Sequence, residues 1–200
     1  MVNITLLFLK ENIISFFGIK AYESENYGRI INQKQFLRLK NLLSQGEIIF
    51  GGNYNEQNNY ISPTLIKPYE LNNSLMQEEI FGPILPILEF ENIENVIEYI
   101  NQRPRPLALY YFGTKNANII KQTISGGVCI NDAIMHIIPH NLPFGGIGQS
   151  GMGAYHGKKS FDTFSHYKSV LKTHKNFEFK IKYPPYTSLK QKIIRLFMDR

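Results

Sequence analysis

The middle of the chain constrains the fold most, because extended apolar runs and amphipathic helices alternate along it. Residues 81–90 carry two prolines, which disfavour a helix and leave an extended run. Residues 92–102 place apolar side chains at helical spacing behind an asparagine N-cap. Apolar runs at 107–113 and 128–133 flank a short helix at 116–124. This order predicts an α/β fold in which right-handed crossovers bring all three strands into one parallel sheet.

A second helix is predicted closer to the N-terminus, over residues 32–45. Phe36, Leu39 and Leu43 fall on one face of such a helix, so that face is expected to be buried. Gly46 is placed to end it. The predicted core therefore begins well before the strand-rich middle of the chain.

Three further strands and a final helix complete the prediction. Residues 47–52 form a β-branched and aromatic run that ends at two glycines. Residues 60–66 also look extended, but Pro63 points to an edge strand or irregular pairing. Residues 165–172 alternate enough for a strand, and residues 189–200 form a basic amphipathic helix. No internal repeat and no low-complexity linker divides the chain.

Composition places the chain among globular proteins that bury a core, with 43% hydrophobic residues. Its net charge of +6 mainly bears on solubility. The first 20 residues are apolar but lack the leading charge and the cleavage site of a signal peptide. No run has the roughly 20 apolar residues that cross a bilayer. A cytoplasmic protein is expected, with membrane contact through the basic tail helix possible but not favoured.

The single cysteine, Cys129, excludes an intramolecular disulfide and a cysteine-rich zinc site. It lies in a strand that is predicted to be buried, where cysteine behaves as a small apolar residue. A nucleophilic thiol needs an exposed, electropositive setting or an adjacent base, for which His136, His140 or His156 would have to lie beside it. The core role is therefore favoured over catalysis.

The densest glycine segment, residues 143–157, superficially resembles a dinucleotide-binding fingerprint. That fingerprint needs a preceding strand and a helix that opens within it, and Pro143 argues against both. A loop in which two backbone segments pass closely is the favoured interpretation. No metal site is expected, because Pro139 lies between His136 and His140 and prevents a shared helical face.

The acidic pair Glu78 and Glu79, followed by Phe81, stands at the mouth of a predicted strand. A carboxylate there can accept hydrogen bonds from sugar hydroxyls, and an aromatic face can cover a flat ring. Taken alone, the pattern fits a helix cap or a surface role better than it fits ligand binding.

Several longer motifs resemble the aldehyde dehydrogenase superfamily, and most of all its class 3, fatty aldehyde dehydrogenase-like branch. In chain order they are MQEEIFGPILPI, INQRPRPLALYYF, GGVCIND with IMH, LPFGGIGQSGMGAYHGKKSFDTFSH and KYPPY. They run from about residue 5 to about residue 187. The resemblance is to the C-terminal portion of those enzymes only.

The resemblance implies an enzyme that oxidises aldehydes to carboxylic acids with NAD or NADP, through a cysteine thiohemiacetal and a thioester. Glu79 matches the glutamate that binds the nicotinamide ribose, and Phe81 matches the aromatic residue beside the nicotinamide. Phe144 matches a residue that lines the aldehyde pocket, and His156 is expected near that pocket. Residues 165–172 match the strand that joins subunits in the family's dimers.

The same resemblance places the nucleophilic cysteine, the general-base glutamate, the oxyanion asparagine and the cofactor domain before the part of the family that this chain matches. Cys129 aligns with a variable position, so no catalytic residue is assigned. Residues 1–164 are interpreted as a partial catalytic domain, and residues 165–200 as an oligomerisation strand with a basic tail helix.

Four hypotheses follow. The favoured one is the C-terminal part of an aldehyde dehydrogenase, inactive alone. The second is a non-catalytic remnant that pairs with itself or with an intact aldehyde dehydrogenase subunit. An independent thiol enzyme that uses Cys129 and a membrane-surface module that uses the tail helix are less favoured. Nucleic acid is not expected as a partner.

Overall fold

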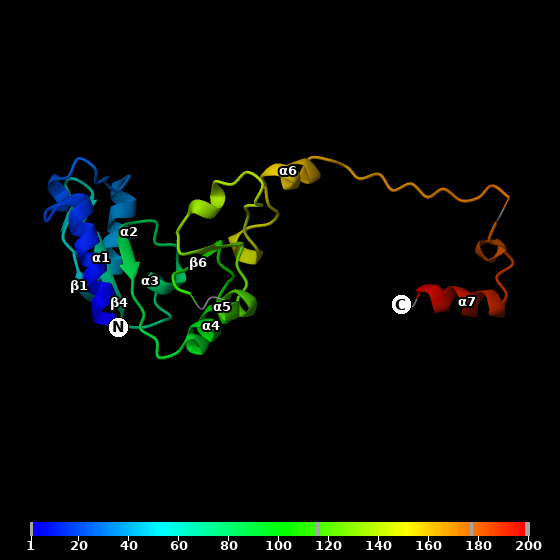
Figure 1. Ribbon diagram of the computed structural model, residues 1–200, viewed down its shortest axis with the longest axis horizontal. Coiled ribbons are helices and arrows are strands. Elements are labelled where there is room, and N and C mark those ends of the chain that lie inside the picture. The colour runs from blue at the N-terminus through cyan, green and yellow to red at the C-terminus, as the bar shows by residue number, and fades with distance from the viewer. Residues whose placement is uncertain (1, 115–116, 177, 199–200) are drawn as a thin grey trace. The chain divides into compact units, whose positions relative to one another are not determined.

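The computed structural model describes residues 2–114, 117–176 and 178–198 (Figure 1). The chain forms two compact units, Met1–Arg103 and Pro104–Arg200. The boundary falls within the sequence RPRP at residues 103–106. The predicted division after residue 164 stays a prediction.

The first unit carries four α-helices, a 3-10 helix and five strands. The helices are α1 (Val2–Phe17), α2 (Gln33–Leu43), α3 (Ser74–Gln77) and α4 (Ile93–Asn101), with η1 at Ala21–Glu23. The strands are β1 (Gly46–Phe50), β2 (Tyr54–Asn55), β3 (Tyr60–Ile61), β4 (Thr64–Pro68) and β5 (Ile84–Pro86).

The core of the first unit forms where α2 packs on the sheet. β1 pairs with β4 antiparallel, and β4 pairs with β5 parallel, so β4 is the central strand. The buried cluster draws on α2, α3 and the strands beside them: Phe36, Leu39, Leu42, Leu43, Ile61, Ile66, Leu75 and Ile84. The predicted apolar face of α2 is thus confirmed, with Phe36 and Leu39 at 0% exposure.

The predicted N-cap of Asn92 is formed, and the structure adds an N-cap at Asn32 that was not predicted. The side chain of Asn32 accepts from the Gln35 N–H at the start of α2, at 2.9 Å. That of Asn92 accepts from the Asn95 N–H at the start of α4, at 3.0 Å. Each bond satisfies a backbone donor that lacks a partner within its helix, which explains why these boundaries were predictable. α2 ends at Leu43, three residues before Gly46, which instead begins β1.

The predicted strand at 60–66 is split in the structure. β3 ends at Ile61 and pairs only with β2, and β4 begins at Thr64 beyond Pro63. Proline lacks the N–H of a ladder bond, which accounts for the break. Of the two alternatives predicted from Pro63, irregular pairing is confirmed, and an edge strand is wrong for β4, because the residues after the proline have partners on both sides.

The second unit contains β6 (Ala108–Tyr111), α5 (Ala117–Gln122), β7 (Gly127–Ile130), α6 (Gly157–Thr163) and α7 (Ser188–Met198). Three 3-10 helices lie at η2 (Met135–Ile137), η3 (Gly148–Ser150) and η4 (Lys180–Lys182). β6 and β7 pair parallel across α5, as the alternating pattern predicted. Asn116, the first residue of the helix predicted at 116–124, lies outside the described residues.

The single parallel sheet expected from the sequence is wrong. β5 belongs to a mixed three-stranded sheet, and β6 with β7 forms a separate two-stranded one. β5 pairs over only three residues. Its partner is β4, which precedes it in the sequence, and not β6, which follows it. The fold is therefore α/β, built from small mixed sheets flanked by helices.

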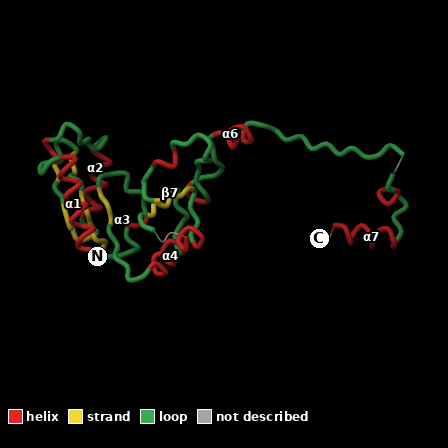
Figure 2. The backbone as a smooth tube through the Cα atoms, viewed as in Figure 1, coloured by secondary structure: helices red, strands yellow, loops and turns green. Residues whose placement is uncertain are grey.

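Residues 165–174 carry no regular secondary structure (Figure 2). Val170 and Leu171 are 79% and 90% exposed. Strands are defined by backbone pairing, so a segment whose partner would be another subunit shows none in a single chain. The predicted oligomerisation strand stays a prediction.

Among the residues that the structure describes, no helix is long and apolar enough to cross a membrane.

Candidate functional site

Glu79 and Phe81 lie on the turn that joins α3 to β5 in the first unit. Glu79 is exposed, and within the described ranges its carboxylate has no hydrogen-bond or ion-pair partner. Phe81 is 85% exposed although it is a large aromatic residue. Its backbone has a φ of +46°, in the left-handed region that residues with a Cβ seldom adopt. The turn therefore exposes the Glu79 carboxylate and the Phe81 ring, which stand two residues apart in the sequence.

The turn is anchored on both sides of Phe81. Ile80 packs against the buried cluster of the first unit. Its carbonyl accepts a hydrogen bond from Arg38 Nη2 at 2.5 Å, and the Glu79 carbonyl accepts from Nη1 at a longer 3.4 Å. Sequence reasoning missed Arg38, which lies on α2 about 40 residues before its acceptors.

Phe144 and His156 are brought together in the second unit. Phe144 forms an isolated antiparallel bridge with Tyr155, with bonds of 3.0 and 2.9 Å in the two directions. The bridge brings the His156 ring to 6.3 Å from the Phe144 ring, centroid to centroid. Tyr155 packs edge-on against His156 at 4.3 Å. The two predicted pocket residues thus belong to one aromatic cluster.

A further histidine in this cluster was not predicted for the pocket. The His136 ring lies 5.5 Å from Phe144 and 5.8 Å from Tyr110. Both of its ring nitrogens are buried, and neither has a hydrogen-bond partner in the described part of the chain. Two imidazole rings, of His136 and His156, therefore lie near the Phe144 ring. The sequence had suggested His136 only as a possible base for Cys129.

Cys129 lies on β7, opposite Tyr110 of β6, and is half-buried. Its expected full burial is wrong, because a two-stranded sheet leaves part of each strand open. Across the described ranges, no hydrogen bond joins its thiol to a histidine, and no group of three or more His, Cys, Asp or Glu side chains could hold a metal ion. In the described part of the chain, no hydrogen bond therefore activates the Cys129 thiol.

The glycine-rich segment brings backbones close together, as predicted. A Cβ on Gly145 would lie 2.1 Å from the Gly153 carbonyl oxygen, and one on Gly146 would lie 2.1 Å from that of Ser150. Such distances leave no room for a side chain at either position. The segment ends at His156, whose backbone N–H donates to Ser160 Oγ as α6 begins.

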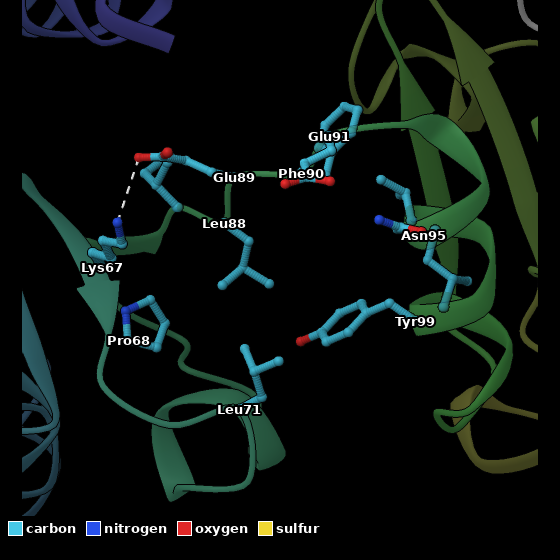
Figure 3. A pocket seen from close by; sticks show the side chains of 12 residues that line it. Lys67, Pro68, Leu71, Leu88, Glu89, Phe90, Glu91, Asn95 and Tyr99 are labelled. Carbon is cyan, nitrogen blue, oxygen red and sulfur yellow. Dashed lines mark ion pairs between the residues drawn. The ribbon is translucent and has the colours of Figure 1, made fainter.

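An apolar pocket of about 800 Å³ lies in the first unit between the residues after β5 and α4 (Figure 3). The side chains of Leu71, Leu88 and Tyr99 point toward one another within it. The Tyr99 hydroxyl is buried without a partner in the described residues, and Lys67 pairs with Glu89 at 3.6 Å on one side. None of the four predicted site residues lines this pocket.

Comparisons with known proteins agree on one family. The model of the family described as "Aldehyde dehydrogenase family" matches residues 16–170. Aldehyde dehydrogenase family 3 member A2 of Rattus norvegicus is 46% identical over 195 residues, which cover 95% of this chain and 40% of that protein. The dimeric NADP-preferring aldehyde dehydrogenase of the same species is 48% identical over 183 residues, covering 88% and 40%.

Solved structures show the same relationship. A structure of Staphylococcus aureus AldH in a substrate-bound state is 45% identical with a TM-score of 0.75, covering 95% of this chain and 42% of that one. A Mycobacterium tuberculosis aldehyde dehydrogenase complexed with NAD+ is 28% identical with a TM-score of 0.66, covering 75% and 33%. The chain spans about 40% of the length of the curated relatives that it matches. The chain belongs to the aldehyde dehydrogenase family.

Proposed function

We propose that these 200 residues are the C-terminal part of an NAD(P)-dependent enzyme that oxidises aldehydes to carboxylic acids. One observation carries the proposal beyond family membership. Phe81 is held in a left-handed conformation with its ring 85% exposed, and the nearby Glu79 carboxylate has no partner among the residues that the structure describes. Burial in the core does not explain this arrangement, whereas a ligand with a flat ring and hydroxyl groups does.

The two residues fit the nicotinamide end of the cofactor. Glu79 accepts hydrogen bonds from the ribose hydroxyls, because an ionised carboxylate is an acceptor only. Phe81 offers an apolar face to the nicotinamide ring and keeps water from it. The chemistry that the dinucleotide supplies when bound is acceptance of a hydride from the substrate. The affinity of this chain alone should be low, since the residues proposed to bind the cofactor reach only one end of it.

The aromatic cluster in the second unit is proposed as a wall of the aldehyde pocket. Phe144 and Tyr155 offer apolar faces, and their bridge fixes the Phe144 backbone. Such a wall suits an aldehyde with a hydrocarbon chain, because apolar surfaces gain from mutual burial. His156 lies against both rings, and its Nδ1 is 3.3 Å from the Leu142 carbonyl oxygen.

The chemical step needs groups that we do not assign to these residues. In the family, a thiolate attacks the aldehyde, and a glutamate activates the water that releases the acid. We propose that these groups lie on polypeptide outside the 200 residues, in the part of the family that precedes the matched region. Cys129 is not proposed as the nucleophile, because no hydrogen bond joins its thiol to a base in the described residues and because it aligns with a variable position of the family.

The test is complementation. The chain is assayed for reduction of NAD and NADP with a medium-chain aldehyde, alone and mixed with a polypeptide that supplies the preceding region of a family 3 relative. We expect no turnover alone and measurable turnover in the mixture, reduced by Phe81→Ala. Turnover by the chain alone that is abolished by Cys129→Ser would contradict the proposal, and failure of a correctly folded mixture would favour the non-catalytic alternative.

We further propose that residues 165–172 pair with another subunit, either a second copy or an intact relative. Residues 166–172 are exposed, and they include Val170 and Leu171. An unpaired extended backbone with apolar side chains is a template for strand addition. Analytical ultracentrifugation should show a dimer that Leu171→Pro weakens, since proline removes a backbone donor. A monomer at all concentrations would contradict this assembly.

A further inference from the structure

The conformation of the Phe81 turn needs an external support. A residue with a Cβ loses steric freedom at a φ of +46°, so it stays there only where its surroundings hold it. The Phe81 side chain supplies no such support, because its ring is 85% exposed. The support must therefore act on the backbone of the turn or on its neighbours.

Arg38 provides that support through two successive carbonyls. Its Nη2 donates to the Ile80 carbonyl at 2.5 Å, and its Nη1 reaches the Glu79 carbonyl at 3.4 Å. A guanidinium presents its donors in a rigid planar fork, so one side chain fixes two acceptors relative to each other. The Arg38 Nε donates to Gln35 Oε1 at 2.8 Å on the same helix, which holds the fork in place.

The next residue of α2 supports the other side of the turn. A Cβ on Gly82 would lie 2.6 and 2.7 Å from the two terminal methyl carbons of Leu39. The backbone directly after Phe81 thus rests on a side chain that is 0% exposed. Arg38 and Leu39 together hold the residues before and after Phe81, and both belong to one capped helix.

We propose that Arg38 is a positioning residue for the nicotinamide end of the cofactor site. It fixes the carbonyls of Glu79 and Ile80, and through them it sets the angle between the Glu79 carboxylate and the Phe81 ring. The inference rests on the proposed function, which makes those two side chains the cofactor contacts. Arg38 acts through the turn and not on the cofactor itself: three of its five N–H donors bond to the Glu79 and Ile80 carbonyls and to Gln35.

The experiment measures the contact between the turn and the nicotinamide ring directly. Saturation-transfer NMR detects weak binding, so the full chain is studied with NAD in excess and the nicotinamide protons are observed. The variants are Arg38→Met, which removes the donors, and Arg38→Lys, which keeps the charge without the planar fork. The matched control is Lys34→Met, an exposed cation on the same helix.

We expect saturation transfer to the nicotinamide protons to fall by about fivefold or more in Arg38→Met, the size of effect that loss of a charge-assisted hydrogen bond produces. Arg38→Lys should give an intermediate signal, and Lys34→Met should match the wild type. Amide hydrogen exchange should accelerate at residues 79–82 in both Arg38 variants, and circular dichroism should show an unchanged helix content.

Each outcome decides a different point. A wild-type chain with no nicotinamide signal refutes the cofactor role of the turn, and the proposed function loses its carrying observation. A wild-type signal that persists in a folded Arg38→Met chain refutes the positioning role alone and leaves the proposed function standing. If Arg38→Met does not fold, Arg38→Lys decides, and a wild-type signal from that variant overturns the inference.

Discussion

Replacing Gly82 by alanine tests the packing beneath the Phe81 turn. The new Cβ would lie 2.6 and 2.7 Å from the Leu39 methyl carbons, about 1 Å inside a normal carbon–carbon contact. Leu39 cannot turn away to solvent, because it is 0% exposed at the centre of the buried cluster. Overpacking of this kind costs about 1–3 kcal/mol, so we expect Gly82→Ala to lower the free energy of unfolding by about 2 kcal/mol.

A double-mutant cycle makes the prediction specific. Leu39→Ala alone should cost about 2–5 kcal/mol, because it leaves a cavity. In the double variant the alanine methyl at position 82 enters that cavity, so the combined loss should be smaller than the sum by about 1 kcal/mol or more. Urea unfolding followed by far-UV circular dichroism gives the four free energies.

The control is Gly28→Ala in the same unit. A Cβ at position 28 would meet no atom within 4 Å, and Gly28 has no positive φ. This variant should be neutral or stabilising by up to about 1 kcal/mol, through the unfolded chain alone. If the cycle is additive within about 0.5 kcal/mol, the reasoning about contact between Gly82 and Leu39 is refuted.

Three further predictions concern other parts of the chain. Gly126→Ala should destabilise the second unit by about 2 kcal/mol or more, because its Cβ would lie 2.3 Å from the Gly145 carbonyl oxygen; the thermal unfolding midpoint measures this. Asn92→Ala should cost about 1 kcal/mol and speed hydrogen exchange at the start of α4, because the N-cap bond is lost. A hydrogen bond from Lys158 lowers the pKa of Asp162, so the folded state binds this proton less readily than the unfolded state. The interaction between Lys158 and Asp162 should therefore stabilise α6 above the ordinary carboxyl pKa of 3.8, and this stabilisation should be lost as the pH falls through the lowered pKa. Carboxyl chemical shifts would follow the titration, and Asp162→Asn should abolish this pH dependence.

Local signals in the sequence predicted the helices well. The apolar spacing and the asparagine caps of α2 and α4 act within a few residues, so they can be recognised without tertiary information. Strand pairing depends on distant partners. This explains why the separation of β5 from β6 and β7 was not predicted, whereas the local effect of Pro63 on strand pairing was expected.

The candidate site was only partly predictable for the same reason. Family resemblance, and not periodicity, identified Glu79, Phe81, Phe144 and His156, and the structure brings the last two together. The left-handed backbone at Phe81 has no sequence signature, since the position holds neither glycine nor asparagine. The contact from Arg38 joins residues about 40 positions apart, a distance that no local pattern reports.

The helix α2 contributes both to the core and to the conformation of the Phe81 turn, and this has a consequence for thermal stability and for protein engineering. One face of this helix supplies Phe36 and Leu39 to the interior, while its Arg38 holds the exposed turn. Any change that loosens the helix should therefore weaken the proposed contact with the nucleotide before the unit unfolds as a whole. Substitutions that are meant to make the Phe81 turn more flexible should be placed outside α2, because destabilising this helix would disturb the core and the proposed cofactor contacts together.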